Sequence, residues 1–238
     1  MTQAVLELSG VVKDYRGLRP LRIAALRVAV GEHVALVGMD QVAAEVLVNL
    51  VTGATLPEAG DVHVFGRPTS AIADSADWLA TVDRFGIVSE RAVLLEQFTV
   101  IQNLAMPFTL EIDPPPDAAR SRARGLAREV GLEESSWDRP IAALDRTARV
   151  RLRLGRALAL DPAVLVLEHV SAGLSPQDAG ALGADIRALA GRREASIVAT
   201  TLDLAFARAT AGRVLNWEPA TGRLTEQRSD RWFGRLLG

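Results

Sequence analysis

Residues 33–45 most constrain the fold of this chain, because they read as a buried strand that runs directly into a loop and a helix. The run HVALVG is short, continuous and apolar, as in a parallel strand covered on both faces. A helix is predicted from about Val42, with the apolar residues Val46, Leu47, Leu50 and Val51 on one face. This strand–loop–helix order is the setting in which a phosphate-binding loop occurs.

The loop itself departs from the phosphate-binding pattern G-x-x-x-x-G-K-[ST]. In that pattern glycines let backbone N–H groups close on phosphate, the lysine reaches the β/γ-phosphates, and the hydroxyl holds Mg²⁺. Gly38 begins the correct spacing, but Ala43, Ala44 and Glu45 stand where Gly, Lys and Ser or Thr belong. No other lysine can substitute, because Lys13 is the only one in the chain. The surroundings predict a nucleotide-binding fold without the residues that hold the nucleotide.

Strand and helix signals alternate along the rest of the chain. Paired strands are predicted at 5–12 and 21–30, and further strands at 60–66, 85–88, 163–168 and 195–200. Helices are predicted at 99–108, 117–130 and 176–190, with the Pro114-Pro115-Pro116 run as a break. This order predicts an α/β fold with a parallel core. Because residues 90–144 carry no strand signal, we interpret about 90–145 as a helical subdomain inserted into one domain spanning 1–238.

Composition excludes several classes of function. The 27 basic and 29 acidic residues leave a net charge of −2, so nucleic acid is not expected as a partner. The chain has no cysteine, which excludes disulfides and thiolate metal sites. The N-terminal sequence lacks a secretory signal, and no apolar run approaches the ~18 residues that span a bilayer. We expect a cytoplasmic protein that reaches a membrane only through a partner.

The whole chain resembles the nucleotide-binding subunit of an ABC transporter, and ordered landmarks carry the resemblance. They are VVKDY at 11–15 with Tyr15 at the adenine-stacking position, Gly53, Pro57, Gly60 and Gly66, FTVIQNLAMP at 98–107, LGRALALDP at 154–162 and LVLEHVSAGLSP at 165–176. The resemblance implies an ABC-type P-loop NTPase fold with N-terminal antiparallel strands, a parallel α/β core and an inserted helical subdomain. The TVIQNLAMP wording is closest to the lipoprotein-release and macrolide-export branch.

Each catalytic motif differs from that family's pattern. Glu90 replaces the Q-loop glutamine, and the LSGGQ signature reads Leu144, Asp145, Arg146, Thr147 and Ala148. The Mg²⁺ aspartate is Glu168, the catalytic glutamate is His169, the D-loop aspartate is Ser175 and the switch histidine is Leu202. These departures imply a pseudo-ATPase with no catalytic residue, no metal site, and no cofactor, since neither ATP nor Mg²⁺ is expected to bind tightly.

Several of these residues have two interpretations. Asp40 and Glu45 either cap a helix N-terminus, where a carboxylate contributes ~0.3–1 kcal/mol, or occupy the vestigial anion site themselves. For Tyr15 we favour packing over stacking on adenine. For His169 we favour a hydrogen-bonded structural histidine over a base. Arg146 either extends towards a partner's phosphate or, as we favour, lies with Asp145 at a solvated helix start.

The sequence therefore predicts a non-hydrolysing subunit that docks on a transmembrane permease at the inner face of the cell membrane. It would pair with a motif-complete ATPase subunit or with itself. A scaffold protein that uses the fold without nucleotide is the alternative, and an active ATPase with divergent motifs is the third. Docking is assigned to the surface residues Glu90, Arg91, Glu96 and Gln97. The terminal RSDRWFGRLLG, with Trp232, Phe233, Leu236 and Leu237, predicts either a short docking helix or core packing.

Overall fold

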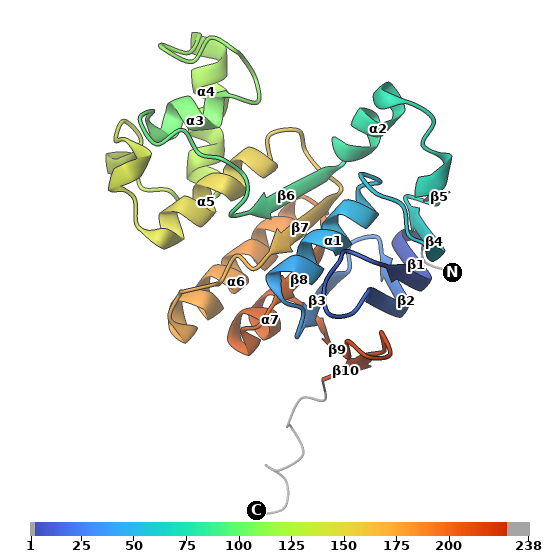
Figure 1. Ribbon diagram of the computed structural model, residues 1–238. Helices are drawn as coiled ribbons and strands as arrows, with labels where there is room; N and C mark the ends of the chain where they lie inside the picture. The colour runs from blue at the N-terminus through green and yellow to red at the C-terminus, as the bar shows by residue number, and fades with distance from the viewer. Residues whose placement is uncertain (1–2, 228–238) are drawn as a thin grey trace, which may run out of the picture.

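The computed structural model describes residues 3–227, which form two sheets with helices around them (Figure 1). The first sheet is antiparallel, with strand order β2-β1-β4-β5. Its strands are β1 (Ala4–Lys13), β2 (Leu21–Ala29), β4 (Ala59–Val64) and β5 (Arg67–Pro68). The alternating N-terminal pattern predicts β1 and β2, the strand predicted at 60–66 corresponds to β4, and β5 is not predicted.

The second sheet has six strands in the order β10-β9-β3-β8-β7-β6. They are β3 (His33–Val37), β6 (Phe85–Ser89), β7 (Val164–Glu168), β8 (Ser196–Thr201), β9 (Arg213–Trp217) and β10 (Leu224–Glu226). All pairings are parallel except that of β10 with β9. Because the strands are parallel, the ends of β3, β6, β7 and β8 that carry the predicted site lie at one edge of the sheet.

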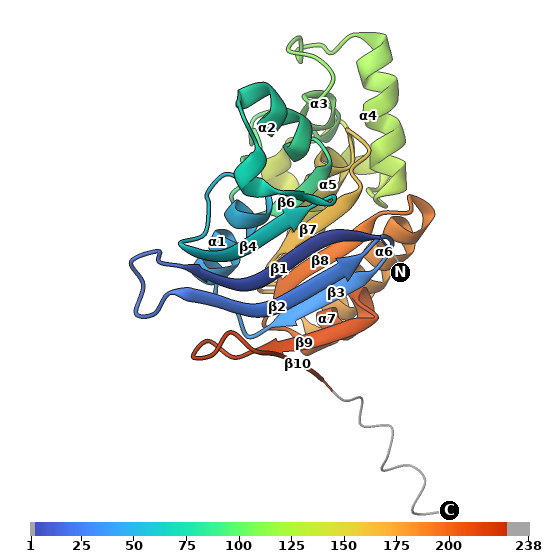
Figure 2. The ribbon, with the colours of Figure 1, turned by 90° about the vertical axis from the view of Figure 1, so that its right-hand side faces the viewer.

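Two apolar cores lie on opposite faces of this second sheet. Val34 and Leu36 of β3 belong to the core that the first sheet and helix α1 (Gln41–Val51) complete. Ala35, which points the other way, belongs to the core under α6 (Pro176–Arg192) and α7 (Leu204–Thr210). Figure 2 shows β1, β2 and β4 layered over the strands of the second sheet. Coverage on both faces explains the continuous apolar run of β3.

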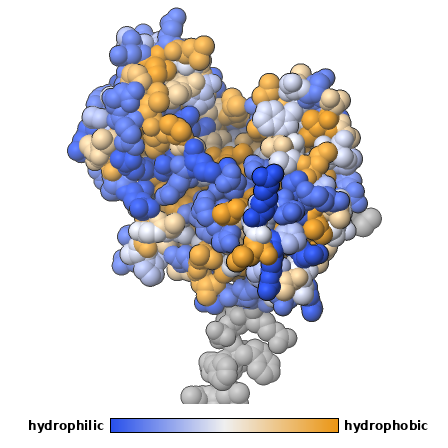
Figure 3. Space-filling model, in the orientation of Figure 1, coloured by the Kyte–Doolittle hydropathy of each residue, from blue (hydrophilic) through white to orange (hydrophobic). Residues whose placement is uncertain are grey.

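Helices without strands separate β6 from β7 and form a lobe of their own (Figure 1). They are α3 (Val100–Ala105), α4 (Asp117–Glu129) and α5 (Arg146–Ala157), with 3₁₀ turns η2 (Glu134–Ser136) and η3 (Ile141–Ala143). A second lobe carries η1 (Thr69–Ala71) and α2 (Ser75–Val82). Figure 3 shows a hollow in the surface between the two lobes.

Buried Asn103 fixes the start of the helical lobe. Its side-chain oxygen accepts from the Leu95 N–H at 2.9 Å, and its amide donates to the carbonyls of Leu95 and Thr99 at 3.1 and 3.0 Å. Thr99 and Gln102 add a capping box at the N-terminus of α3. These bonds anchor the segment between β6 and α3, at Leu95, to helix α3.

The predicted fold class is confirmed, while several element ends differ from the prediction. The helix predicted at 99–108 ends at Ala105, and the strand predicted at 60–66 ends at Val64 because Phe65 and Gly66 both have positive φ. The sequence patterns did not predict α2, α7, β5, β9 or β10. The terminal RSDRWFGRLLG segment lies outside the described residues. None of the described helices has the length and apolarity that a bilayer-spanning helix needs.

Gly60 should be far less tolerant of alanine than Gly66. Both have positive φ, near 80°, so each alanine pays a similar backbone penalty of ~1–2 kcal/mol. A Cβ on Gly60 would also lie 2.4 Å from the backbone of Ser9 and Gly10, whereas one on Gly66 meets nothing within 4 Å. We expect Gly60→Ala to lower the free energy of unfolding by at least ~2 kcal/mol more than Gly66→Ala, measured by urea denaturation. Equal losses would contradict the crowding.

Candidate functional site

Asp40 caps helix α1, which follows the loop after β3. Its carboxylate accepts the backbone N–H of Ala43 at 2.7 Å, and Ala44 N–H donates to the Asp40 carbonyl at 3.0 Å. Gly38 has φ +98 and donates its N–H towards the Thr201 carbonyl at 3.4 Å. The N–H groups of Gly38, Ala43 and Ala44 are thus paired within the chain. Of the two interpretations of Asp40, the structure places it as a cap, and its negative charge lies at the positive end of α1.

Glu168 ends β7 with its side chain fully buried, and Arg91 neutralises it. The Arg91 guanidinium donates to both carboxylate oxygens, from Nη2 at 2.6 Å and from Nε at 3.2 Å. Gln41 Nε2 donates to the same carboxylate at 2.5 Å. Arg91 Nη1 also lies 3.1 Å from Glu45 Oε1. The guanidinium therefore bridges the two carboxylates, at the positions where the family's pattern has its two Mg²⁺-contacting residues.

Strand register explains why Arg91 reaches this position. β6 and β7 pair in parallel with Ser89 opposite Glu168, so Arg91 leaves β6 only two residues beyond that pairing. The hydrogen bonds to Glu168 are the main cause that raises the pKa of Arg91 above its ordinary value; burial opposes this rise, and the charges of Glu168 and Glu45 add to it. Buried carboxylates are costly unless a charged partner and hydrogen bonds compensate them, and here both are present.

The signature-like residues form the start of α5. Asp145 caps this helix by accepting the Ala148 N–H at 2.7 Å, and Leu144 packs on the adjoining core. Arg146 donates from Nη1 to the Glu90 carboxylate and to the Ala172 carbonyl, both at 3.1 Å. The predicted helix start is present. However, Arg146 is bound to its own chain rather than only solvated, and Thr147 is half-buried beside it.

Three further arginines of α5 hold the segment that follows Glu90. Arg149 forms a two-point ion pair with Glu96 at 2.7 and 3.1 Å. Arg153 donates to the Ala92 carbonyl at 3.4 Å and Arg156 to the Val93 carbonyl at 2.6 Å. Burial is the main cause that lowers the pKa values of Arg153 and Arg156. We call residues 90–97 the clamped segment, because it is tied to α5 at four points and to Glu168 through Arg91.

The remaining family-motif positions are those of His169, Leu202 and Ser175. His169 is buried with φ +48, and its Nε2 has no hydrogen-bond partner among the described residues, so the favoured hydrogen-bonded histidine is wrong for this nitrogen. Leu202 is 66% exposed. Ser175 caps α6 by accepting the Asp178 N–H at 3.1 Å. Within residues 3–227 no three His, Asp or Glu side chains are grouped to hold a metal ion.

Tyr15 lies near the vestigial loop, two residues after β1 ends. It is half-buried and packs on the core beneath the first sheet, as the packing interpretation expects. Burial and, secondarily, the charge of Asp40 raise its pKa. Because the charge of Asp40 acts on the Tyr15 hydroxyl, Tyr15 lies close to the loop at 38–41.

The sequence patterns do not predict the two side chains that bind the Glu168 carboxylate, Arg91 and Gln41. The sequence assigns Arg91 to the docking surface and does not single out Gln41. Two signals were available: Arg91 follows directly after the Q-loop position, and Glu168 needs a cation once the lysine and metal ligands are gone.

A family model described as ABC transporter matches residues 21–170. The chain belongs to the ABC transporter family. The cassette is 28% identical to the lipoprotein-releasing system ATP-binding protein LolD of Saccharophagus degradans over 87% of its own length and 92% of the relative. The LolD protein of Pseudomonas syringae pv. tomato is 31% identical over 82% and 84%. The resemblance to the lipoprotein-release branch is therefore confirmed.

Solved structures share the fold of this cassette at low sequence identity. The cbiO1 protein of Clostridium perfringens, part of the ABC transporter complex cbiONQ, superposes with a TM-score of 0.77 at 19% identity, over 94% of this chain and 87% of that one. A dimeric ATP-binding cassette bound to ADP and Pi superposes with a TM-score of 0.73 at 20% identity, over 94% and 99%. The predicted ABC-type fold is confirmed.

Removal of the Arg91 side chain should cost much more stability than removal of Arg149. Arg91→Ala leaves the buried Glu168 carboxylate without its cation, so we expect a loss of about 3 kcal/mol in the free energy of unfolding. Arg149→Ala breaks a pair whose Glu96 side chain is 51% exposed, and should cost less than about 1 kcal/mol. Urea denaturation measures both variants.

A third variant keeps this prediction decisive if Arg91→Ala folds poorly. Adding Glu168→Gln to Arg91→Ala removes the orphaned charge and should restore most of the lost stability, as a double-mutant cycle would reveal. Additive losses in the cycle would mean that Arg91 does not act through Glu168.

Proposed function

We propose that this cassette is a non-hydrolysing subunit of a membrane transport or membrane-remodelling complex. The observation that carries the proposal is the guanidinium of Arg91 between Glu45 and Glu168, at 3.1 and 2.6 Å. A cation of the chain itself thus lies where the family's pattern places Mg²⁺. The residues present do not fit Mg-ATP, because a metal at these carboxylates would first have to displace Arg91.

The phosphate side of the vestigial site supports the same proposal. Hydrolysis of ATP draws on positive charge and N–H donors around the phosphates. The chain has no lysine after residue 13, and the Asp40 carboxylate already accepts the Ala43 N–H at the N-terminus of α1. A triphosphate would therefore meet a carboxylate rather than an open cradle. We infer that Tyr15, near this loop, cannot by itself anchor a nucleotide.

Purified cassette should show no ATP affinity tighter than millimolar and no hydrolysis above background. Isothermal titration with Mg-ATP and a phosphate-release assay measure the two, with a motif-complete LolD protein as the positive control. Micromolar binding, or turnover that a His169→Ala change abolishes, would overturn the proposal. His169 is the test position because it stands where the family's pattern has its catalytic glutamate.

The proposed partner is a transmembrane permease, with the cassette held at the inner face of the membrane through it. The hollow between the α2 lobe and the helical lobe of α3, α4 and α5 is the proposed docking region (Figure 3). The clamped segment joins the core to this helical lobe. All four docking residues proposed from the sequence are exposed, but Glu90, Arg91 and Glu96 are engaged by internal ion pairs. We therefore add Val93, whose side chain is 72% exposed, and retain Gln97.

Internal pairing changes how docking must be tested. Reversing Glu90, Arg91 or Glu96 would break contacts inside the cassette as well as any contact outside it. Val93→Asp and Gln97→Arg leave the ion pairs of Glu90, Arg91 and Glu96 intact. The Val93 contact with Arg156 uses only the backbone carbonyl of Val93. These substitutions separate docking from folding.

Val93→Asp should reduce co-purification with the permease about tenfold or more, because a buried charge replaces an apolar contact. Leu18→Asp is the matched control, since Leu18 is fully exposed on the loop between β1 and β2. Glu45→Ala, at the vestigial site, should also leave the complex unchanged. If Val93→Asp and Gln97→Arg have no effect, or Glu45→Ala dissolves the complex, the docking assignment is wrong.

A scaffold role without a partner ATPase is the second candidate, and the capping of α5 favours it. In the family's pattern, nucleotide lies between one chain's phosphate loop and the signature of the other chain. Here Asp145 occupies the N-terminus of α5, and Arg146 is bound to Glu90 and Ala172. Neither half of a shared site is therefore free in this chain. Co-purification that recovers a permease together with a motif-complete ATPase would favour the transporter role, and recovery of neither would favour the scaffold.

A further inference from the structure

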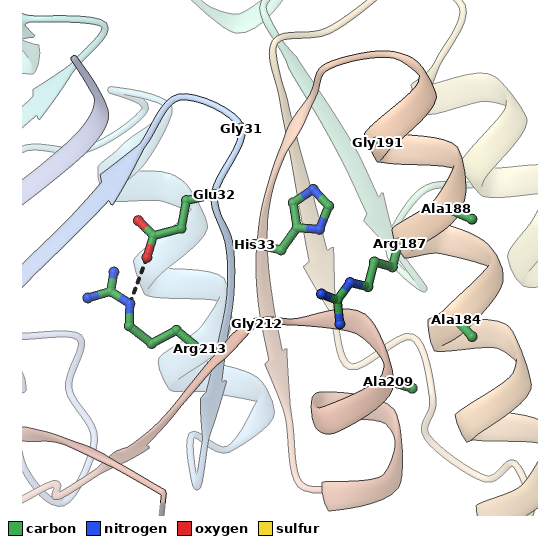
Figure 4. Close-up of a pocket in the computed structure, with 10 residues that line it drawn as sticks. All are labelled: Gly31, Glu32, His33, Ala184, Arg187, Ala188, Gly191, Ala209, Gly212 and Arg213. Carbon is green, nitrogen blue, oxygen red and sulfur yellow. Dashed lines mark ion pairs between the residues drawn. The ribbon is translucent and has the colours of Figure 1, made fainter. Parts of the chain in front are cut away.

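A groove of about 860 Å³ lies at the opposite end of the second sheet from the vestigial site (Figure 4). It opens where β3 and β9 begin, and α6 and α7 form its wall. Small residues line most of it: Gly31, Ala184, Ala188, Gly191, Ala209 and Gly212. Since these side chains leave the space unfilled, bulky apolar groups can enter it.

The charged residues of the groove restrict what can occupy it. Glu32 and Arg213 form an ion pair with each other at 2.8 Å. The ring nitrogen Nε2 of His33 lies 3.2 Å from the Ala195 carbonyl, and burial and then Arg187 lower the His33 pKa below its usual value. Arg187 is exposed beside His33, and its guanidinium has no hydrogen-bond or ion-pair partner among residues 3–227 (Figure 4). The groove thus favours an occupant with large apolar side chains and one carboxylate.

Strand register leads the chain's own C-terminal segment to this groove. β10 runs antiparallel to β9 with Glu226 opposite Leu215, and the Gln227 N–H donates to the Val214 carbonyl at 2.9 Å. The next residue of β9 in that direction is Arg213, which lines the groove. At Gln227 the chain is therefore one register position from Arg213, at the edge of the groove.

Residues 228–238, outside the described part of the chain, have the composition that the groove favours. Trp232, Phe233, Leu236 and Leu237 recur at the spacing of one helix face. Asp230 is the only acidic residue of the segment. Its three arginines suit the nearby C-terminal ends of α6 and α7, where carbonyl groups favour cations.

We propose that residues 228–238 dock in the groove of the same chain, with Trp232 and Phe233 against its glycine and alanine lining and Asp230 near Arg187. A tryptophan and a phenylalanine each bury roughly 150–250 Å² when they pack, which is suited to a cavity of this size. The docked segment would cover the junction of α6, α7 and the start of β3. This inference is independent of nucleotide binding and of the permease.

Engineered cysteines test the contact directly, because the chain has none of its own. The pairs Ala184→Cys with Gly234→Cys and Ala188→Cys with Gly234→Cys keep the aromatic residues intact. Under mild oxidation, or with a short bis-maleimide, we expect cross-links within one chain. Leu79→Cys with Gly234→Cys is the control and should not cross-link, since Leu79 lies on α2. Links only between chains would mean a second copy occupies the groove, and no link in either pair would overturn the proposal.

Two further measurements separate docking from chance encounter. Arg187→Asp should lower the cross-linking yield several-fold, and adding Asp230→Arg should restore it. Ending the chain at Gln227 should lower the Tm by about 2–4 °C and speed amide exchange in α6 and α7. Unchanged yield in the charge variants together with unchanged exchange after truncation would overturn the proposal.

Discussion

The ion pair of Arg91 with Glu168 is the interaction on which the rest of the site depends. A fully buried carboxylate is costly by several kcal/mol unless a cation and hydrogen bonds accompany it. In this cassette the guanidinium supplies the cation, Gln41 supplies a further hydrogen bond, and Glu45 is joined to the same guanidinium. The strand order places these groups together. Strands β6 and β7 are neighbours, and α1 follows β3, which lies two strands from β7.

The arginines of α5 extend this charge pairing into the helical lobe. Arg146, Arg149, Arg153 and Arg156 fall on one side of the helix at spacings of three or four residues, so all four face the clamped segment. The exposed pairs contribute little each, but the bonds from Arg153 and Arg156 to backbone carbonyls fix the path of the chain. The join between core and helical lobe is therefore held by contacts that need no ligand.

The two ends of the parallel sheet differ in how their polar groups are satisfied. At the carboxyl end, helix N-termini and acidic side chains are paired within the chain through Asp40, Asp145 and Arg91. At the amino end, a groove lined by glycine and alanine remains, with Arg187 beside it. This contrast is physical: charge pairs close the first end, whereas small side chains leave space at the second.

Sequence alone determined the fold class and the paired N-terminal strands. It could do so because apolar periodicity, the buried run of β3 and the Gly and Pro landmarks are local properties of the chain. It did not give α2, α7, β5, β9 and β10, whose short segments lack a distinct local pattern. Nor could the sequence predict the ion pair of Arg91 with Glu168, because the pattern around Arg91 is typical of an exposed charge. Only the register of β6 on β7 brings its guanidinium to Glu168, because pairing between distant segments is decided by tertiary packing.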